Sequence, residues 1–427
     1  MTNEPLFTSR RSFLSGSLTF LSAAATMPVF LGRTASALAQ QQPTSRRGND
    51  GRRILVVVQL AGGNDGLNTV VPYEMDEYYK LRPRLAVPKK DVLRLKDGVG
   101  LHPAATGLKQ LFDSGRMAIV QGVGYPNPNR SHFTSMDIWH TADPEQRTHE
   151  GWLGRYFDAC CSGADPAPEP IQGVALMTEA PLAMQGDRFM PLAFEDPESL
   201  TWRAGRRDAR AEEVYRKLNA GSATASEAGL AGYLQRAALQ AQVGADEIRQ
   251  ALGRGLSRRR GAAGGLRQRG QLGDSLDRVA RMIAADLPTR IYYVSMSGFD
   301  THTGQEFRHR RLMEEFGNAM SDFIDTLDEH KLLDRVLVMS FSEFGRRVQE
   351  NASGGTDHGE AAPMFLFGSK VRPGLHEKQP SLSNLHRGDL AFGCDFRRVY
   401  ASVLRDWLEM DPRKILPPMQ PLRLIAG

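Results

Sequence analysis

The sequence predicts an α/β fold with a mostly parallel sheet and helices on both faces. Short apolar runs that suit buried strands recur at residues 54–60, 117–122, 291–297, 335–341 and 364–367. Segments with helical spacing of apolar residues occur among them, at 103–113, 134–140, 316–327 and 400–408. Strands and helices that alternate in this way are typical of parallel sheets whose two faces are both covered.

The first of these runs, Ile-Leu-Val-Val-Val-Gln-Leu at 54–60, is the clearest strand. Its apolar residues are continuous rather than alternating, as expected for a strand buried on both faces. It ends in the glycine-rich turn at 61–66. We therefore expect this strand in the middle of the sheet.

The region 200–280 differs from the rest of the chain. It is rich in Ala, Arg and Gln, and it contains the basic stretch 254–269. We interpret it as a helical insertion, with the Arg-rich part as a solvated loop or, alternatively, a contact with an anionic surface. Residues 53–427 are then expected to form a single domain that carries this insertion.

The N-terminal 39 residues have the order of an export signal. Arg10 and Arg11 precede an apolar stretch at 13–31, and small residues at 35–39 offer a cleavage site. The paired arginines followed by Phe-Leu predict the twin-arginine route, with the Tat translocase as a transient partner. Pro28 and the shortness of the apolar stretch argue against a membrane anchor. We expect a periplasmic or secreted protein that is not integral to the membrane after cleavage, with a disordered leader at 40–52.

Composition excludes some classes of protein. The chain has 427 residues, 41% hydrophobic content and a net charge of +5. Three arginines and one glutamate in the first 39 residues leave +3 on the remainder, which is too little to indicate nucleic-acid binding. The three cysteines, Cys160, Cys161 and Cys394, allow at most one plausible disulfide, so the fold does not depend on a disulfide framework.

Acids and histidines follow the predicted strands at the points where they end. In parallel α/β sheets the carboxyl ends of the strands form the binding edge. The candidate ligands at this edge are Asp65, Asp300, His302, Glu343, Asp357 and His358. Carboxylates with imidazoles suit one or two divalent ions, and imidazole favours zinc, manganese or iron over calcium or magnesium, with zinc or manganese as the expected ion. Two ions about 4 Å apart would activate a nucleophile and clamp a phosphoryl-like group.

Each candidate ligand also has a structural interpretation. Asp65 would suit a tight turn, and Asp300 would cap the following helix. Glu343 would pair with a neighbouring arginine, and His358 would be an exposed loop residue. A shared site is the interpretation that explains their recurrence at successive strand ends.

A second candidate feature lies at 125–133, after the second strand. Ser131 precedes a predicted helix, where free N–H groups favour anions. It would be a nucleophile attacking phosphorus if a metal lowered its pKa, or else a simple helix cap. Arg130 and Arg346 would bind oxyanions bidentately.

These motifs resemble the DUF1501 family, a large group of twin-arginine-exported bacterial proteins of undefined function. The segments that carry the resemblance are 62–68, 298–302 with Gln305, 342–346, 355–359, 130–133 and 395–397. That family is grouped with the alkaline phosphatase–sulfatase superfamily. The resemblance implies an alkaline-phosphatase-like fold and a two-metal site at the ends of a parallel sheet.

The resemblance also implies roles for individual residues. Ser131 matches the nucleophile and Asp65 the acid after the first strand, while Asp300 with His302 matches an Asp/His pair on one metal. The chain departs from the superfamily in this pair, which is spaced Asp-x-His, and at the next strand end, where Ser342-Glu343 replaces Asp-His. No Cys-x-Pro-x-Arg or Ser-x-Pro-x-Arg segment occurs, which argues against a formylglycine sulfatase.

The first functional hypothesis is an exported metal-dependent hydrolase of phosphate or sulfate esters, acting on a small-molecule or polymer substrate. In it Ser131 attacks and Arg346 holds the equatorial oxygens. The second is a non-catalytic metal- or ligand-binding protein on the same scaffold. A third is a component of a cell-surface or polymer-processing assembly.

Overall fold

The computed structural model describes residues 52–160, 170–196, 210, 244–253 and 270–426. The chain divides into two units, and apart from Arg210 these residues belong to the unit Asn49–Glu198 and Gly244–Gly427. The predicted signal, the leader, the loop at 258–265 and most of the predicted insertion lie outside the described residues. The fold below is that of this unit.

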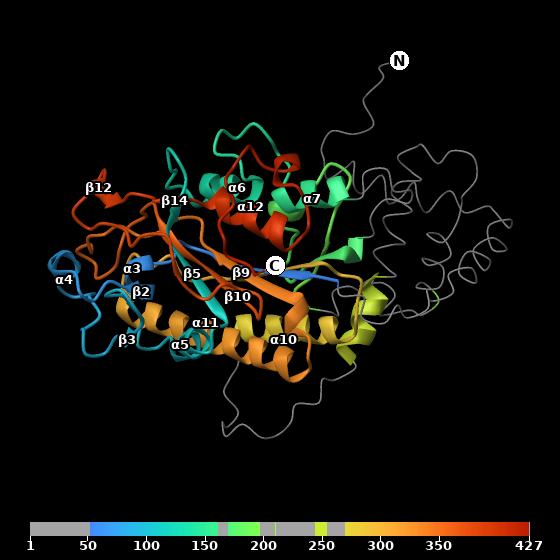
Figure 1. Cartoon of the computed structure of the whole chain (residues 1–427), viewed down its shortest axis with the longest axis horizontal. Coiled ribbons are helices and arrows are strands. Elements are labelled where there is room, and N and C mark those ends of the chain that lie inside the picture. Colours follow the sequence, from blue (N-terminus) through green and yellow to red (C-terminus); the bar gives the residue numbers. More distant parts are fainter. Residues whose placement is uncertain (1–51, 161–169, 197–209, 211–243, 254–269, 427) are drawn as a thin grey trace, which may run out of the picture. The chain divides into compact units, whose positions relative to one another are not determined.

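A nine-stranded sheet forms the middle of the unit (Figure 1). Its order is β11-β5-β10-β9-β1-β8-β6-β7, and β14 pairs with β5. The strands are β1 (Ile54–Leu60), β5 (Met117–Gly124), β6 (Gly173–Ala175), β7 (Leu192–Ala193), β8 (Ile291–Met296), β9 (Val336–Phe341), β10 (Ala362–Phe367), β11 (Gly374–His376) and β14 (Cys394–Asp395). All pairs are parallel except the two made by β10, so the prediction of a mostly parallel sheet is confirmed.

The direction of β10 matters for function. It runs antiparallel to both of its neighbours, β9 and β5. Its first residue, Ala362, therefore lies at the edge where β9 and β5 end. The loop that enters β10 is thus brought to the carboxyl ends of the parallel strands.

Helices cover both faces of the sheet, as predicted (Figure 1). One layer contains α6 (His132–Thr141), α7 (Trp152–Cys160) and α12 (Phe396–Asp406). The other contains α5 (Thr106–Asp113), α10 (Gln271–Ala284) and α11 (Gln305–Glu329). Every residue of β1 is buried, which agrees with its uninterrupted apolar sequence and its place between β8 and β9.

Aromatic stacking holds the first helical layer together. Trp139 of α6 stacks on Phe396 of α12 at a centroid distance of 4.3 Å, and Trp152 of α7 stacks on Tyr400 at 4.3 Å. All four side chains are buried. Since each large aromatic ring buries much apolar surface, these two pairs fix the three helices against the sheet.

Smaller elements complete the unit. Two further sheets join β2 (Val70–Val71), β4 (Gly100–Leu101) and β3 (Leu93–Arg94), and β12 (Leu385–His386) with β13 (Asp389–Leu390). The short helices are α3 (Gly66–Thr69) and α4 (Asp76–Leu81), with 3-10 turns at Pro170–Gln172, Leu182–Met184, Leu333–Arg335 and Pro412–Lys414. The sequence patterns did not predict these elements because most are too short to show a period.

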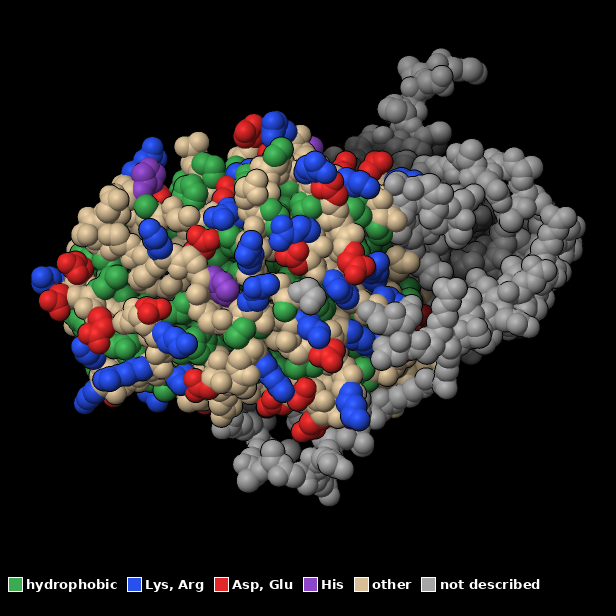
Figure 2. Space-filling view, in the orientation of Figure 1, with side chains coloured by type: hydrophobic (Ala, Val, Ile, Leu, Met, Phe, Trp, Pro, Cys, Tyr) green, Lys and Arg blue, Asp and Glu red, His purple; other side chains and the backbone are tan. Residues whose placement is uncertain are grey.

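Of the predicted insertion, residues 244–253 and α10 are helical. In the described part of the chain, no helix combines the length and apolar character needed to span a membrane. Cys160 is exposed, whereas Cys394 is buried and has a free thiol. Figure 2 shows acidic and basic side chains interspersed on the face in view, which agrees with the small net charge.

One buried histidine makes the free energy of unfolding depend on pH. His140 of α6 lies under the helical layer with Nε2 3.0 Å from the Tyr293 hydroxyl, and burial lowers its pKa from 6.5 to about 3. Below pH 6.5 the unfolded chain binds a proton at this residue that the folded protein does not, so the free energy of unfolding falls as the pH falls.

We expect His140→Gln to reduce the loss of unfolding free energy between pH 7 and pH 5 by about 2 kcal/mol, since one fewer proton is taken up on unfolding. Urea denaturation at the two pH values measures this difference. His149→Gln removes an exposed histidine and is the matched control, expected to keep the wild-type difference. An unchanged pH dependence in His140→Gln would contradict the prediction.

Candidate metal centre

A cluster of histidines surrounds one aspartate at the carboxyl edge of the sheet. Asp300 and His302 come from the loop after β8, and His358 from the loop that enters β10. His132 is the first residue of α6, which follows β5. The parallel strands and the reversed β10 therefore bring together residues that lie far apart in the sequence.

The Nε2 atoms of three imidazoles converge on Oδ1 of Asp300. The distances are 3.1 Å from His302, 3.1 Å from His358 and 3.5 Å from His132. His302 and His358 also face each other, with their Nε2 atoms 2.9 Å apart. The ligand atoms of His132, Asp300 and His358 all lie within 4.8 Å of one another.

Acceptors behind the rings determine how two of the imidazoles are oriented. Nδ1 of His132 lies 2.8 Å from Oε1 of Glu343, and Nδ1 of His302 lies 3.1 Å from Oδ1 of Asp357. An ionised carboxylate only accepts hydrogen bonds, so each Nδ1 carries the proton. In a neutral ring Nε2 then has a free lone pair, and it points toward Asp300.

The third ring is held in the same way by the backbone. Nδ1 of His358 lies 2.8 Å from the carbonyl oxygen of Arg130, which also only accepts. The facing Nε2 atoms of His302 and His358 are therefore two lone pairs at 2.9 Å when both rings are neutral. Such a contact is repulsive unless a cation, either a proton or a metal ion, lies between the two nitrogens.

Charge at the cluster is uneven. Burial raises the pKa of Asp300, but the hydrogen bond from Arg346 and the contact with the imidazole of His358 outweigh burial and lower the pKa to about 2. The hydrogen bond to Glu343 raises the pKa of His132, whereas burial lowers the pKa of His358. At neutral pH the centre thus presents an ionised carboxylate to its imidazoles.

The spacing of the ligand atoms suits a metal ion. Ligands at 2.0–2.1 Å in a tetrahedron are separated from one another by about 3.3 Å. The Nε2 atoms of the three imidazoles lie 3.1–3.5 Å from Oδ1 of Asp300, and those of His302 and His358 lie 2.9 Å from each other. Nε2 of His132 is buried and meets no hydrogen-bond partner among the described residues. An unsatisfied buried nitrogen that points into a set of ligand atoms is what a metal site requires.

Glu343 and Asp357 lie behind the histidines rather than at the centre. Oε1 of Glu343 accepts from the backbone N–H of Gly62 at 2.8 Å as well as from His132. Oδ1 of Asp357 accepts from Asn351 Nδ2 at 3.1 Å as well as from His302. Both carboxylates, which we predicted as direct ligands, therefore orient histidines by hydrogen bonds to Nδ1, an arrangement common around protein-bound metals.

Asp65 does not join the cluster, in contrast to its predicted place among the ligands. Its carboxylate is fully buried, forms a 2.6 Å ion pair with Arg82 and accepts a hydrogen bond from Gln305. It also caps α3 through the N–H of Asn68. Burial raises the pKa of Asp65, but Arg82 outweighs burial and keeps the pKa below its ordinary value.

Arg346 is not available to hold the oxygens of a substrate, which differs from its predicted role. Its side chain is fully buried. It donates to Asp300 Oδ1 at 2.5 Å and to four backbone carbonyls, those of Gly62, Gly63, Phe299 and Thr356. All the nitrogens of the guanidinium are thus used inside the protein.

Two glycines allow the loops to approach this closely. Gly62 and Gly63 have φ values of +118° and +81°. A Cβ atom would lie 2.4 Å from the backbone nitrogen of Asp300 at position 62, and 2.4 Å from the ring of Phe344 at position 63. Phe344 in turn packs against His358, with ring centroids 4.7 Å apart. The glycine-rich turn after β1 therefore shapes the centre without contributing a ligand.

Ser131 and two arginines flank the centre. Ser131 is exposed at the N-cap of α6, next to His132, and its side chain makes no capping hydrogen bond. Arg130 and Arg347 both form ion pairs with the buried carboxylate of Asp389, and Nε of Arg347 lies 3.2 Å from its Oδ1. More than a third of each arginine side chain is exposed. Burial raises the pKa of Asp389.

His132 was missed as a ligand by the sequence interpretation. It lies beside Ser131 in a segment singled out for a nucleophile, eight residues after β5 ends. A search for histidines after the end of β5, like the search made after β8, would have identified His132. Glu343 and His132 are 211 residues apart, and no sequence pattern predicts their contact.

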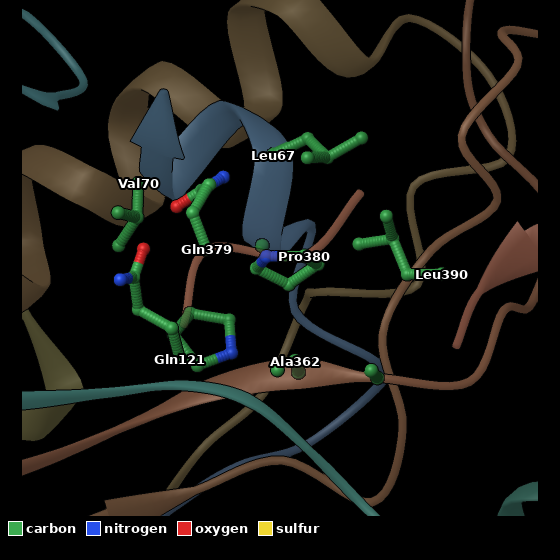
Figure 3. A pocket seen from close by; sticks show the side chains of 11 residues that line it. Leu67, Val70, Gln121, Ala362, Gln379, Pro380 and Leu390 are labelled. Carbon is green, nitrogen blue, oxygen red and sulfur yellow. The ribbon is translucent and has the colours of Figure 1, made fainter. Parts of the chain in front are cut away.

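A hollow among the described residues lies away from the histidines (Figure 3). It lies between α3, β5 and the start of β10, and its walls are largely apolar. The amide groups of Gln121 and Gln379 both turn toward Val70, and their buried oxygens meet no described donor. None of the four cluster residues lines this hollow, so it is not part of the candidate metal centre.

Comparison with known proteins gives one family and several partial structural likenesses. A model described as "Protein of unknown function (DUF1501)" matches residues 118–384. No curated protein matches the sequence significantly.

Solved structures share parts of the fold at low similarity. A protein in the alkaline phosphatase superfamily from Vibrio parahaemolyticus has a TM-score of 0.35 at 8% identity, over 77% of this chain and 63% of that one. The C-terminal periplasmic domain of EcEptC from Escherichia coli, solved in complex with Zn, has a TM-score of 0.35 at 9% identity. The match covers 74% of this chain and 73% of that one. The PsFucS1 sulfatase from Pseudoalteromonas sp. has a TM-score of 0.34 at 9% identity, and the match covers 84% of this chain and 70% of that one. The function of this chain has to be argued from its own residues.

We expect Asp65→Asn to destabilise the fold by about 3–5 kcal/mol, because it leaves the buried Arg82 without its counter-ion, while bound metal is retained. Urea denaturation and metal analysis of the folded protein measure the two effects. The control is Asp411→Asn, which breaks an exposed pair with Arg413 and should change the unfolding free energy little. Normal stability with loss of metal would instead make Asp65 a ligand.

Proposed function

The chain belongs to the DUF1501 family, and we propose that it is an exported metal-dependent hydrolase of phosphate or sulfate esters. The proposal builds on the cluster of His132, Asp300, His302 and His358 and on the groups beside it. The proposal also includes membership of the alkaline phosphatase–sulfatase superfamily, which the sequence motifs suggest.

The observation that carries the proposal is the opposed pair of imidazoles. Hydrogen bonds behind the rings of His302 and His358 leave two lone pairs facing each other at 2.9 Å, beside an ionised Asp300. A divalent cation relieves the repulsion and neutralises the carboxylate at once. Imidazole nitrogens with one carboxylate favour zinc or manganese.

Such an ion, when bound, acts as a Lewis acid and lowers the pKa of a hydroxyl beside it. Four residues would hold it: His132, Asp300, His302 and His358. Glu343 and Asp357 would hold a proton on Nδ1 of His132 and His302 and so turn Nε2 of each ring toward the ion.

Ser131 is the proposed nucleophile. Its hydroxyl is exposed, has no capping bond to its own helix and belongs to the residue next to His132. Attack by Oγ on phosphorus or sulfur forms one ester bond while the bond to the leaving alcohol oxygen breaks. Water then hydrolyses the serine ester, so one water is consumed for each ester cleaved. The free N–H groups at the start of α6 would stabilise the anionic group in both steps.

Arg130 and Arg347 take the oxyanion-binding role that Arg346 cannot fill. The carbonyl of Arg130 contacts His358, and the N–H of Arg347 donates to the carbonyl of Asp357, so both arginines adjoin the ligand loop. Asp389 fixes both guanidinium groups, and each keeps a solvent-facing part. A guanidinium with free N–H groups binds phosphate or sulfate through paired hydrogen bonds.

Export belongs to the proposal and rests on the sequence of residues 1–39. The paired arginines at positions 10 and 11 and the small residues at 35–39 are typical of a twin-arginine signal. A periplasmic or secreted location would follow, with the Tat translocase as partner during export only.

A non-catalytic metal-binding protein is the second candidate. The observation in its favour is that Asp65 and Arg346, two residues expected to serve catalysis, are buried in internal ion pairs. In this alternative the same four residues bind the ion, but no ester is turned over.

Metal content and turnover of paired variants test the first candidate. We expect His302→Ala and His358→Ala each to lower metal affinity by at least about 10-fold and to abolish hydrolysis, since each removes a ligand. Ser131→Ala should keep the metal and lose at least about 100-fold in kcat on phosphomonoester, phosphodiester or sulfate ester substrates.

The exposed His149 provides a control, because His149→Ala should leave both metal content and turnover unchanged. Purified protein without metal in any growth condition would overturn both candidates. Bound metal with no turnover on any of the three ester classes would favour the second candidate over the first.

For Arg347→Gln we expect inhibition by inorganic phosphate to weaken by about 10-fold or more, since one charge-assisted hydrogen bond is lost. Metal affinity should not change, because Asp389 keeps Arg130 as its partner. Arg413→Gln removes another exposed arginine paired with an aspartate and should leave the inhibition constant unchanged. Equal inhibition constants for Arg347→Gln and the wild type would contradict the proposed role.

A further inference from the structure

Two large apolar side chains are exposed at the helices that begin at the candidate metal centre. Phe133 is 86% exposed and Phe307 is 67% exposed. Met190 is the one other large hydrophobic residue that is strongly exposed among the described residues. Single exposed apolar residues are common on protein surfaces, so what matters here is that both phenylalanines lie at the start of helices that begin at one centre.

Three exposed arginines accompany Phe307 on the first two turns of α11. Arg308, Arg310 and Arg311 form no ion pair with a described residue, and Glu306 is the one acid in the segment 305–311. The segment therefore carries a net charge of +2 with its histidine neutral. We call Phe133, Phe307, Arg308, Arg310 and Arg311 the aromatic–arginine rim.

The rim lies close to the metal ligands. Phe133 directly follows His132, so their Cα atoms are about 3.8 Å apart. Six residue-to-residue steps, three at most fully extended and three helical, lead from His302 to Arg308, which limits their Cα distance to about 15 Å. The start of α11 is also tied to the ligand loops, because Gln305 accepts hydrogen bonds from Thr301 at 3.0 Å and Thr356 at 2.6 Å.

From this juxtaposition we propose that the aromatic–arginine rim binds a polyanionic polymer built of rings, such as a sulfated or phosphorylated polysaccharide. The inference deepens the proposed function and rests on it, because the polymer would be the ester substrate. The rim engages anionic groups and rings of the same polymer next to the ester at the metal centre.

Charge and shape both favour this occupant. Unpaired guanidinium groups bind sulfate and phosphate bidentately, and several in a row select a ligand with several such groups. The two phenylalanines belong to different helices, α6 and α11, so they offer separate ring faces rather than one apolar stripe. Separate faces suit stacking on successive rings, whereas binding to a membrane surface calls for a continuous apolar face.

Direct binding to defined probes tests the proposal. We expect the purified, metal-loaded protein to bind dextran sulfate, to bind neutral dextran at least about 10-fold more weakly, and to lose affinity as salt screens the charges. Arg308→Gln/Arg310→Gln/Arg311→Gln should raise the Kd for dextran sulfate by about 10-fold or more. Phe133→Ser/Phe307→Ser should raise the same Kd by a few-fold while leaving the Kd for polyphosphate, which has no rings, within about twofold.

The matched control is Lys331→Gln/Lys370→Gln/Arg423→Gln. It removes the same charge from exposed positions, one of them just beyond the opposite end of α11, and should leave the Kd for dextran sulfate unchanged. An equal loss in control and rim variants would overturn the proposal, as would failure of the wild type to bind dextran sulfate. Binding to anionic phosphatidylglycerol vesicles with no affinity for dextran sulfate would also overturn it, in favour of a lipid surface.

Two readouts separate this inference from the proposed function. Dextran sulfate binding that persists in His302→Ala, together with normal metal binding in the rim variants, supports an independent rim. Metal and turnover without polymer binding would overturn the rim alone. Polymer binding by a protein that never holds metal would overturn the hydrolase proposal and leave the rim as a binding surface.

Discussion

The guanidinium of Arg346 is the interaction on which the candidate centre depends. It connects the turn after β1, the loop after β8 and the loop before β10 by donating to carbonyls of Gly62, Gly63, Phe299 and Thr356. It also donates to Asp300, the carboxylate around which the imidazoles gather. A lysine has one nitrogen and no fixed fork, so it would not make these contacts together.

A second buried network supports the first. Asp65 forms an ion pair with Arg82 and accepts a hydrogen bond from Gln305. The side-chain oxygen of Gln305 in turn accepts hydrogen bonds from Thr301 and Thr356. These two threonines are the sequence neighbours of Asp300 and Asp357. Because each member is hydrogen-bonded, this polar core fixes the loops instead of weakening them. The motif Gly-Gly-Asn-Asp-Gly after β1 is thus explained by support of the centre, through backbone shape and a buried charge.

The sheet could be predicted from the sequence because long apolar runs identify strands that are buried on both faces. Asp300, His302 and His358 could be predicted as neighbours for a related reason, since strand ends share an edge. Asp65 was predicted as a metal ligand and Arg346 as a holder of substrate oxygens, but both form ion pairs inside the protein, and strand-end position does not distinguish these roles. The partner of Asp65, Arg82, comes from a separate short helical segment that gave no signal of its own.

The reversed strand β10 has a consequence for how the protein is made. His358 is held by the carbonyl of Arg130 across 228 residues of sequence, and β1 completes its pairing only when β8 and β9 exist. Contacts at such separation form late, because a long loop must close before they stabilise the chain. A nascent chain on the ribosome therefore cannot bring the four residues of the cluster together until His358, just before β10, has been synthesised. The proposed ion site would then form only after these distant loops have closed.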